Sequence, residues 1–189
     1  MYTINILSYL RKYLYIDFEI TWEQRKLGEL SNLLNNLRIP ITSSDRIKGS
    51  TPYYGANGIQ DYVSGETHKG DFVLLAEDGA NDIYDYPIIN VKGSIWVNNH
   101  AHVLEGRRGK LYNLFLVYRI KSINISSYLV GGSRSKLNSS ILKKITFMVP
   151  IFKEQILIGN LLNQIDTTIT LHQRNLFFPV KIFNISHIL

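Results

Sequence analysis

The apolar and polar positions divide the chain into a β-type part and a helical part. Three runs rich in β-forming residues occur between residues 40 and 109: DFVLLA at 71–76, YPIINV at 86–91 and SIWVNN at 94–99. Residue pairs that tolerate the positive φ angles of tight turns lie around them: Asn57-Gly58, Asp78-Gly79 and Lys92-Gly93. This part of the chain is therefore predicted to be a compact, turn-rich β region.

Helical spacing replaces this pattern after residue 109. Four large side chains fall at i, i+3, i+4 and i+7 and share one face of a predicted helix: Leu111, Leu114, Phe115 and Tyr118. In the loop VGGSRSKLNSS that follows, Asn138 is suited to be the N-cap of a short helix that ends near Lys143. ITFMVP, at 145–150, has the composition of one more strand, which ends at Pro150.

The most regular pattern in the chain runs from Lys153 to Leu176. Apolar positions and one histidine recur at spacings of 4, 3, 4, 3 and 4 residues: Ile158, Leu162, Ile165, Ile169, His172 and Leu176. This heptad seam predicts one long helix. Two interpretations stay open, a helix that packs on its own domain and a helix that pairs with another helix. Pro179 and the loss of the seam predict that the helix ends soon after Leu176.

The first residues carry a weaker signal. Residues 1–20 contain no clear cap or turn, whereas Trp22, Leu27 and Leu30 can anchor either a strand or a short helix to a core. We therefore place the start of the domain at about Thr21. Charged residues interrupt the apolar residues of the first segment well before the length of a membrane helix: Arg11, Lys12, Asp17 and Glu19. A signal peptide is not expected either, because a small-residue cleavage site is missing.

Composition and charge narrow the classes of protein. With 189 residues, 45% of them hydrophobic and 19% charged, the chain is expected to fold, either as one domain with a real core or as one domain with an extension. Its net charge of +6 suits a polyanionic partner without requiring one. The absence of cysteine excludes disulfides, cysteine zinc sites and thiol nucleophiles, and it fits a cytoplasmic protein.

Motifs for cofactor-dependent catalysis are missing from the sequence. The one Gly-Lys pair, Gly109-Lys110, is followed by Leu111 and not by the Ser or Thr of a phosphate-binding loop. The chain has neither a G-x-G-x-x-G after a strand nor the Asn-Pro-Pro-Tyr or Asp-Pro-Pro-Tyr of adenine methyltransferases. ATP hydrolysis by such a loop and a cofactor-dependent transferase activity are therefore not expected.

Two groups of side chains keep a metal-dependent nuclease open as an alternative. Carboxylates in and after DFVLLA could bind magnesium, remain solvated or accept hydrogen bonds from cytosine: Asp71, Glu77, Asp78 and Asp82. His100 and His102, in NNHAH, are spaced so that an extended strand would point both the same way, but a third zinc ligand is not near them. His68 is the other histidine of the β region.

Side chains suited to DNA are concentrated in loops around 43–58, 77–82, 98–108 and 131–138. Arg and Lys can read guanine, Asn can read adenine, and Ser, Tyr and Lys can hold phosphates. The predicted DNA-binding residues are Ser43, Ser44, Arg46, Lys48, Ser50, Tyr53, Tyr54, Asn57, Asp78, Asn81, Asn98, Asn99, His100, Arg107, Arg108, Ser133, Arg134, Ser135 and Lys136. Each residue alone is typical of an ordinary surface loop, so the prediction rests on their concentration.

Several long blocks, in order, carry a resemblance to a known family. They are WEQRKLGEL, TPYYGANGIQDYV, AEDGAND, IWVNNHAHVL, GGSRSKLNSSILKKITFMVP and EQILIGNLLNQIDTTITLHQR. From about Thr21 to Arg174 the chain resembles the specificity subunit of type I restriction-modification systems. Such subunits have two target-recognition domains in tandem, each followed by a conserved helix, and the two helices pack antiparallel as a spacer.

The resemblance implies an α+β fold with a turn-rich β domain, short helices and a C-terminal spacer helix. Four parts are expected: a divergent segment at 1–20, a DNA target-recognition domain at 21–152, the spacer helix at 153–176 and a divergent tail at 177–189. The residues that pair the helices would be Ile158, Leu162, Ile165, Ile169 and Leu176.

The resemblance also implies a role and partners. The chain would recognise one half of a bipartite site in double-stranded DNA and would have no catalytic activity of its own. Its partners would be modification subunits, which use S-adenosylmethionine to methylate adenine, and restriction subunits, which hydrolyse ATP and translocate DNA. The S-adenosylmethionine, ATP and magnesium would all be bound by these partners.

The chain matches only one of the two expected units. Residues 1–20 and FFPVKIFNISHIL at 177–189 do not match the family, so a half-length or truncated subunit is expected. Two copies could pair as a homodimer through the helix and recognise a symmetric site. The alternatives are an inactive fragment and a decoy that occupies modification subunits.

Overall fold

The computed structural model describes residues 21–132 and 135–177, with side chains up to Gln173 in the last helix. In chain order the elements are β1 (Glu23–Lys26), α2 (Leu27–Leu30), β2 (Ser31–Leu33), the 3-10 turns η1 (Asn35–Leu37) and η2 (Ser43–Asp45), β3 (Lys48–Gly55), β4 (Gly58–Val63), β5 (His68–Ala76), β6 (Ile88–Val97), β7 (Ala101–Gly106), α3 (Asn113–Lys121), the 3-10 turn η3 (Ile125–Tyr128), α4 (Ser139–Leu142), β8 (Thr146–Val149) and α5 (Phe152–Phe177). The predicted divergent segments at 1–20 and 178–189 lie outside the described residues.

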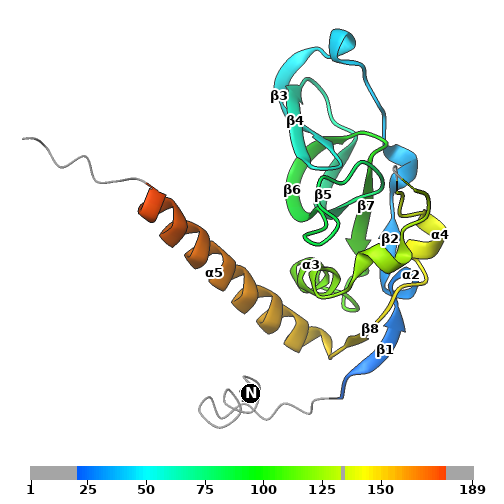
Figure 1. Cartoon of the computed structure of the whole chain (residues 1–189), viewed down its shortest axis with the longest axis vertical. Helices are drawn as coiled ribbons and strands as arrows, with labels where there is room; N and C mark the ends of the chain where they lie inside the picture. Colours follow the sequence, from blue (N-terminus) through cyan, green and yellow to red (C-terminus); the bar gives the residue numbers. More distant parts are fainter. Residues whose placement is uncertain (1–20, 133–134, 178–189) are drawn as a thin grey trace, which may run out of the picture.

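A six-stranded sheet in the order β2-β7-β5-β6-β3-β4 forms the centre of the molecule. Neighbouring strands are antiparallel, except that β3 runs parallel to β6. β1 and β8 form a separate antiparallel pair. Figure 1 shows α3 between the sheet and α5, with α4 and the β1–β8 pair to one side. A mixed sheet with helices that do not alternate with its strands is the α+β class that was predicted.

The sheet buries apolar side chains on both of its faces. Val73 and Leu75 of β5 enter a core that also contains Phe115 of α3, whereas Phe72 and Leu74 enter a second core on the opposite face. Successive side chains of a strand point to opposite faces, so a strand covered on both sides has a continuous apolar sequence. This explains why DFVLLA shows no alternation.

The predicted turn at Lys92-Gly93 is wrong. The segments 86–91 and 94–99 were expected as separate runs, but β6 continues from Ile88 to Val97 and pairs with β5 along its length. Gly93 has a φ angle of 94° and lies opposite Gly70. The glycine therefore bends a continuous strand, because the unbroken partner strand supplies its hydrogen bonds on both sides of the bend. By contrast, Asn57-Gly58 does form the predicted turn, between β3 and β4.

The remaining helical predictions are confirmed with small shifts. Asn138 is the N-cap of α4, whose C-cap is Lys143. α3 begins at Asn113 and α5 spans Phe152–Phe177. No helix in the described ranges is long and apolar enough to cross a membrane.

The first half of α5 packs on α3, as the own-domain interpretation predicts. A Cβ atom at Gly159 would lie 2.8 Å from the backbone nitrogen of Phe115, so the two helices approach closely at this glycine. About two turns further along α5, the Tyr118 hydroxyl donates to Asp166 at 3.0 Å. Ile158 is partly buried and packs against the main core.

The second apolar side of α5 is exposed. Leu157, Leu161, Ile165 and Ile169, here called the free stripe, are 43%, 39%, 45% and 50% exposed and recur every four residues. The structure therefore corrects the predicted pairing seam at two of its residues, which face the domain instead of a second helix. Ile158 and Leu162, both half-buried, lie toward α3, because Leu162 is between Gly159 and Asp166 on the helix surface. The side chain of Leu176 lies outside the described residues.

Candidate nucleic-acid interface

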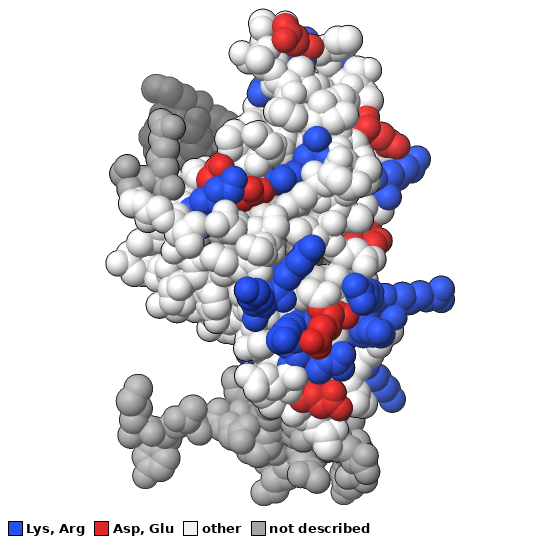
Figure 2. Space-filling model, turned by 90° about the vertical axis from the view of Figure 1, so that its right-hand side faces the viewer, with Lys and Arg blue, Asp and Glu red and all other residues white. Residues whose placement is uncertain are grey.

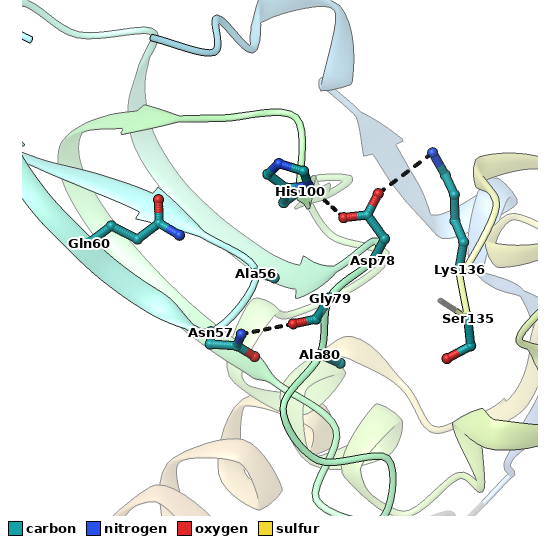
Figure 3. A pocket seen from close by; sticks show the side chains of 9 residues that line it. All are labelled: Ala56, Asn57, Gln60, Asp78, Gly79, Ala80, His100, Ser135 and Lys136. Carbon is teal, nitrogen blue, oxygen red and sulfur yellow. Dashed lines mark hydrogen bonds and ion pairs between the residues drawn. The ribbon is translucent and has the colours of Figure 1, made fainter. Parts of the chain in front are cut away.

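All four of the predicted loop regions contribute to one hollow of about 480 Å³. The hollow is lined by Ala56, Asn57, Gln60, Asp78, Gly79, Ala80, His100, Ser135 and Lys136. Figure 3 shows Gln60 and Asn57 on one side, Ser135 and Lys136 on the other, and Asp78 and His100 between them. The sheet brings these loops together because the turn after β3, the end of β5 and the start of β7 meet at one edge.

Asn57 joins two of the loops that form the hollow. Its Nδ2 donates to the Gly79 carbonyl at 2.9 Å, and its Oδ1 accepts from the Asn81 backbone N–H at 2.9 Å. Both ends of the amide are therefore used inside the protein. Asn57 holds the β3–β4 turn against the loop after β5, and because its side chain is exposed at the hollow, its predicted base-reading role stays a prediction.

A buried carboxylate lies directly behind the hollow. Glu77 accepts from Arg38 Nη1 at 2.6 Å and from Lys136 Nζ at 2.8 Å. The side chains of Glu77 and Arg38 are only 9% and 13% exposed, so this ion pair is largely removed from solvent. Arg38 Nη1 also donates to the carbonyl of Ala101 at 2.8 Å. This hydrogen bond attaches the chain segment that follows η1 to the start of β7.

The main chain of Glu77 connects the same segments. Its N–H donates to the His100 carbonyl at 2.8 Å, and its carbonyl accepts from the Leu137 N–H at 2.7 Å. Burial raises the pKa of Glu77, but the hydrogen bonds from Lys136 and Arg38 outweigh burial and hold that pKa below its usual value. Glu77 is thus a charged centre, here called the Glu77 hub, that positions the loops around the hollow.

His102 and His100 have different environments, because β7 begins at Ala101 and the extended strand that would point both side chains the same way does not include His100. His102 is fully buried, and its Nε2 donates to the Leu137 carbonyl at 2.7 Å while its Nδ1 lies 2.8 Å from Asn35 Nδ2. Burial lowers the pKa of His102, so the ring is neutral and its 3.4 Å approach to Glu77 is not an ion pair. His100 is exposed and contacts Asp78.

The buried histidines predict a loss of stability in weak acid. Burial lowers the pKa of His68 and of His102 below the ordinary histidine value of 6.5. At pH values between 6.5 and these lowered pKa values, the unfolded chain therefore binds more protons than the folded chain does. Stability is therefore complete above pH 6.5 and falls as the pH falls. We expect the free energy of unfolding in urea to drop by about 1 kcal/mol or more between about pH 7.5 and about pH 5.5.

The matched variants for this prediction are His102→Gln and His172→Gln. The pH dependence should shrink in His102→Gln, which removes a buried titrating ring, and should persist in His172→Gln, which removes an exposed one. A wild-type free energy of unfolding that stays constant or rises over this pH range would contradict the prediction.

The carboxylates of the nuclease alternative are dispersed. The Oδ1 atom of Asp71, in β5, accepts hydrogen bonds from the side-chain amides of Asn90 and Asn113. Asp82 accepts from two backbone N–H groups of its own turn. Glu77 is occupied by Arg38 and Lys136. Among the described residues, no group of three or more His, Asp or Glu side chains is arranged to hold a metal ion.

Three of the predicted DNA contacts are buried instead. Tyr53 is 1% exposed, and its hydroxyl is hydrogen-bonded to the main chain of Ile41. Tyr54 belongs to the second core, and Asn98 is buried with its amide bonded to neighbouring residues. The prediction is wrong for these side chains as direct contacts, because all three are buried inside the folded domain.

The remaining predicted contacts that the structure describes do not line the hollow. Figure 1 shows η2, which contains Ser43 and Ser44, at the far end of the molecule beyond β3 and β4. Arg46 packs over Tyr53 and bonds to Asp61. Lys48, Ser50, Asn81 and Asn99 are exposed. Ser133 and Arg134 lie outside the described residues, so their predicted roles stay predictions.

A group of basic side chains surrounds α2 at the opposite end of β7. Figure 2 shows Lys and Arg gathered on the face that is at the right of Figure 1. We define the basic patch as the exposed residues Lys26, Arg107, Arg108, Lys143 and Lys144. Lys26 precedes α2, Lys143 lies against Gly28 of α2, and the Arg107 N–H donates to the Leu30 carbonyl. β7 separates the patch from the hollow by about 20 Å, given the rise of a strand.

Sequence reasoning missed several residues of this interface. Arg38 and Gln60 were not predicted, and Glu77 was considered only as a metal ligand. Lys26, Lys143 and Lys144 were not among the predicted contacts either. A local signal exists only for the Lys143-Lys144 pair, since Arg38 meets Glu77 across 39 residues of chain.

Comparison with known proteins gives a consistent family assignment. The model of the family described as "Type I restriction modification DNA specificity domain" matches residues 19–176. A putative type I restriction enzyme specificity subunit of Haemophilus influenzae is 45% identical over 132 residues, which cover 70% of this chain and 34% of the relative. The EcoprrI specificity subunit of Escherichia coli is 24% identical over 152 residues, which cover 79% and 37%. The chain thus spans little more than a third of the length of these relatives.

Solved structures share the fold. The S subunit of a type I restriction-modification system from M. genitalium matches with a TM-score of 0.65 at 16% identity, over 79% of this chain and 40% of that chain. The HsdS subunit from Thermoanaerobacter tengcongensis matches with a TM-score of 0.55 at 16% identity, over 85% and 41%.

Proposed function

Because the chain belongs to the family of type I restriction-modification DNA specificity domains, we propose that it recognises one half of a bipartite site in double-stranded DNA and directs partner subunits to that site. The observation that carries this proposal is the hollow. Loops that are distant in the sequence place the polar side chains of Gln60, Asp78, His100 and Lys136 around one opening, in a domain of the matching fold.

The basic patch supports DNA binding from a second position. Lysine and arginine side chains hold phosphates and set the register of a protein on DNA, whereas contacts to base edges give the sequence preference. The major groove is about 12 Å wide. A duplex that presents base edges to the hollow can therefore present backbone phosphates to a patch about 20 Å away along β7.

The chemistry is supplied by partners in this proposal. The chain docks modification subunits, which carry S-adenosylmethionine, and restriction subunits, which carry ATP and magnesium, and it binds no cofactor itself. It acts in the cytoplasm, where the chromosome is accessible, and its lack of cysteine suits a reducing compartment.

We also propose that α5 pairs with the α5 of a second copy. The free stripe runs along a helix of 26 residues, about 39 Å long, that projects from the domain in Figure 1. Four exposed aliphatic side chains on one side of such a helix suit burial against another helix. A two-fold pair places two identical recognition domains on one duplex, so the recognised site is symmetric and bipartite.

The test is co-expression of this chain with modification subunits of a type I system, followed by mapping of methylated adenines in the genome. We expect a new bipartite motif whose two halves are related by a two-fold axis. A new but asymmetric motif would contradict the pairing of two copies through α5, but it would still support DNA recognition by this chain. The absence of any new motif would favour an inactive fragment or a decoy that only occupies modification subunits.

A further inference from the structure

Most polar side chains around the hollow are already bonded within the protein. Asn57 uses both ends of its amide, and Lys136 Nζ pairs with Glu77. Asp78 turns one oxygen to His100 at 2.5 Å and the other toward Lys136 at 4.0 Å. Two nitrogen atoms that line the hollow have no partner among the described residues, Nε2 of His100 and Nε2 of Gln60. These two atoms are therefore available to a ligand.

The amide of Gln60 has a defined orientation. The backbone N–H of His100 donates to Asn98 Oδ1 at 2.8 Å, which identifies the other end of the Asn98 amide as its NH₂ group. This NH₂ group donates to Gln60 Oε1 at 3.3 Å. Nε2 of Gln60 is consequently left as a donor. Figure 3 shows this nitrogen directed into the hollow. Gly55 leaves the space that the Gln60 side chain occupies, since a Cβ atom there would overlap with Nε2.

Asp78 gives the His100 ring a defined orientation as well. An ionised carboxylate only accepts hydrogen bonds, so the proton of the ring must be on Nδ1, which faces Asp78. In the neutral ring, Nε2 is then an acceptor. The hollow thus presents a donor on Gln60 and an acceptor on His100.

We propose that Gln60 and His100 together read one adenine in the major groove, and that Asp78 is a positioning residue that sets the tautomer of His100. This inference rests on the proposed function in DNA recognition. Adenine presents an acceptor, N7, beside a donor, the N6 amino group, which complements the donor of Gln60 and the acceptor of His100. Guanine presents two acceptors, thymine presents an acceptor and a methyl group, and cytosine presents only a donor.

The protein holds this pair in place before DNA arrives. The His100 carbonyl accepts from Glu77 N–H, and the Asp78 main chain forms a bridge with Lys136. His100 and its neighbour Asp78 are therefore fixed through the Glu77 hub, and Gln60, in β4, is held by the amide of Asn98. Such preorganisation limits the loss of side-chain entropy on binding and supports discrimination between bases.

The first test selects duplexes that bind the purified full chain from a random pool. His100→Ala and Gln60→Ala should each lose an adenine preference of about 10-fold to 100-fold at one and the same position, with the other positions unchanged. Matched changes on α5, His172→Ala and Gln164→Ala, should leave the whole motif intact. Variants that alter two different positions, a position that does not specify adenine, or no position at all overturn the inference.

A base analogue isolates the contact of Gln60. Replacing the adenine by 7-deazaadenine removes N7 and should weaken wild-type binding as much as Gln60→Ala does. The same analogue should cause no further loss in Gln60→Ala. A loss of equal size in wild type and in Gln60→Ala would place the contact elsewhere and overturn the inference.

Histidine spectra test the role of Asp78 without DNA. In ¹⁵N-labelled protein at mildly alkaline pH, His100, assigned by its absence in His100→Gln, should carry its proton on Nδ1, and Asp78→Asn should remove this preference. A proton on Nε2 in wild type overturns the inference even if DNA binding is normal. If wild type enriches no sequence, the proposed function fails, and the spectra still decide whether Asp78 sets the tautomer that the inference requires.

Discussion

Glu77→Ala is expected to destabilise the domain by about 3 kcal/mol and to remove sequence-specific binding. The substitution leaves Arg38, which is 13% exposed, without its carboxylate, and breaking a buried ion pair from one side costs about 3–5 kcal/mol. The lower end of this range applies because Arg38 keeps its bonds to main-chain carbonyls and because Lys136, at 43% exposed, can be solvated. The free energy of unfolding in urea at neutral pH measures the effect.

Glu29→Ala is the matched control for this prediction. Glu29 also pairs with an arginine, Arg25, at 3.2 Å, but both side chains are well exposed, so the change should cost less than about 1 kcal/mol. The double variant Arg38→Ala with Glu77→Ala should lose less stability than the sum of the two single variants, because the unpaired charge is gone. Equal losses for Glu77→Ala and Glu29→Ala would show that the Glu77 hub does not stabilise the fold.

Leu161→Asp together with Ile165→Asp is expected to convert a paired chain into a monomer without unfolding the domain. Both side chains lie on the free stripe and are 39% and 45% exposed, so a charge there is solvated in the single chain. In a helix pair the same two positions of both copies become buried. The loss of their apolar burial and the added charge repulsion should weaken pairing by about 100-fold or more. Sedimentation equilibrium measures the change.

Asn163→Asp together with Thr170→Asp adds the same charge on the opposite side of α5. Both residues are exposed, and this control should keep the wild-type association. The unfolding transition of each variant shows that the domain itself is intact. A wild-type chain that is monomeric at all concentrations, or a Leu161→Asp and Ile165→Asp variant that pairs normally, would contradict pairing through the free stripe.

Local sequence signals predicted most elements because those signals act over a few residues. The Asn57-Gly58 turn, the strand in DFVLLA and the N-cap at Asn138 each depend on backbone preferences or on burial of neighbouring side chains. Lys92-Gly93 failed because a glycine with positive φ occurs in bends within strands as well as in turns, and only the partner strand distinguishes the two cases.

The sequence predicted which loops form the candidate site, but it did not predict how the side chains of these loops are arranged. Asn57, Asp78, His100 and Lys136 do meet at the hollow, yet neither the use of Asn57 inside the protein nor the burial of Tyr53 follows from their positions in the chain. Polar residues in turn-rich segments can serve structure or binding, and the difference depends on which loops come into contact.

By itself, the sequence determined the family, the α+β class, the turn-rich sheet and the long C-terminal helix, because long ordered blocks and short-range periodicity are independent of contacts between distant residues. Only the tertiary structure decided which side of α5 is free and which atoms face the hollow. Gly159 lets α3 cover one side of α5 and leaves Leu161 exposed, and Glu77 meets Arg38 across 39 residues. Such contacts arise from packing of whole elements, which no local pattern encodes.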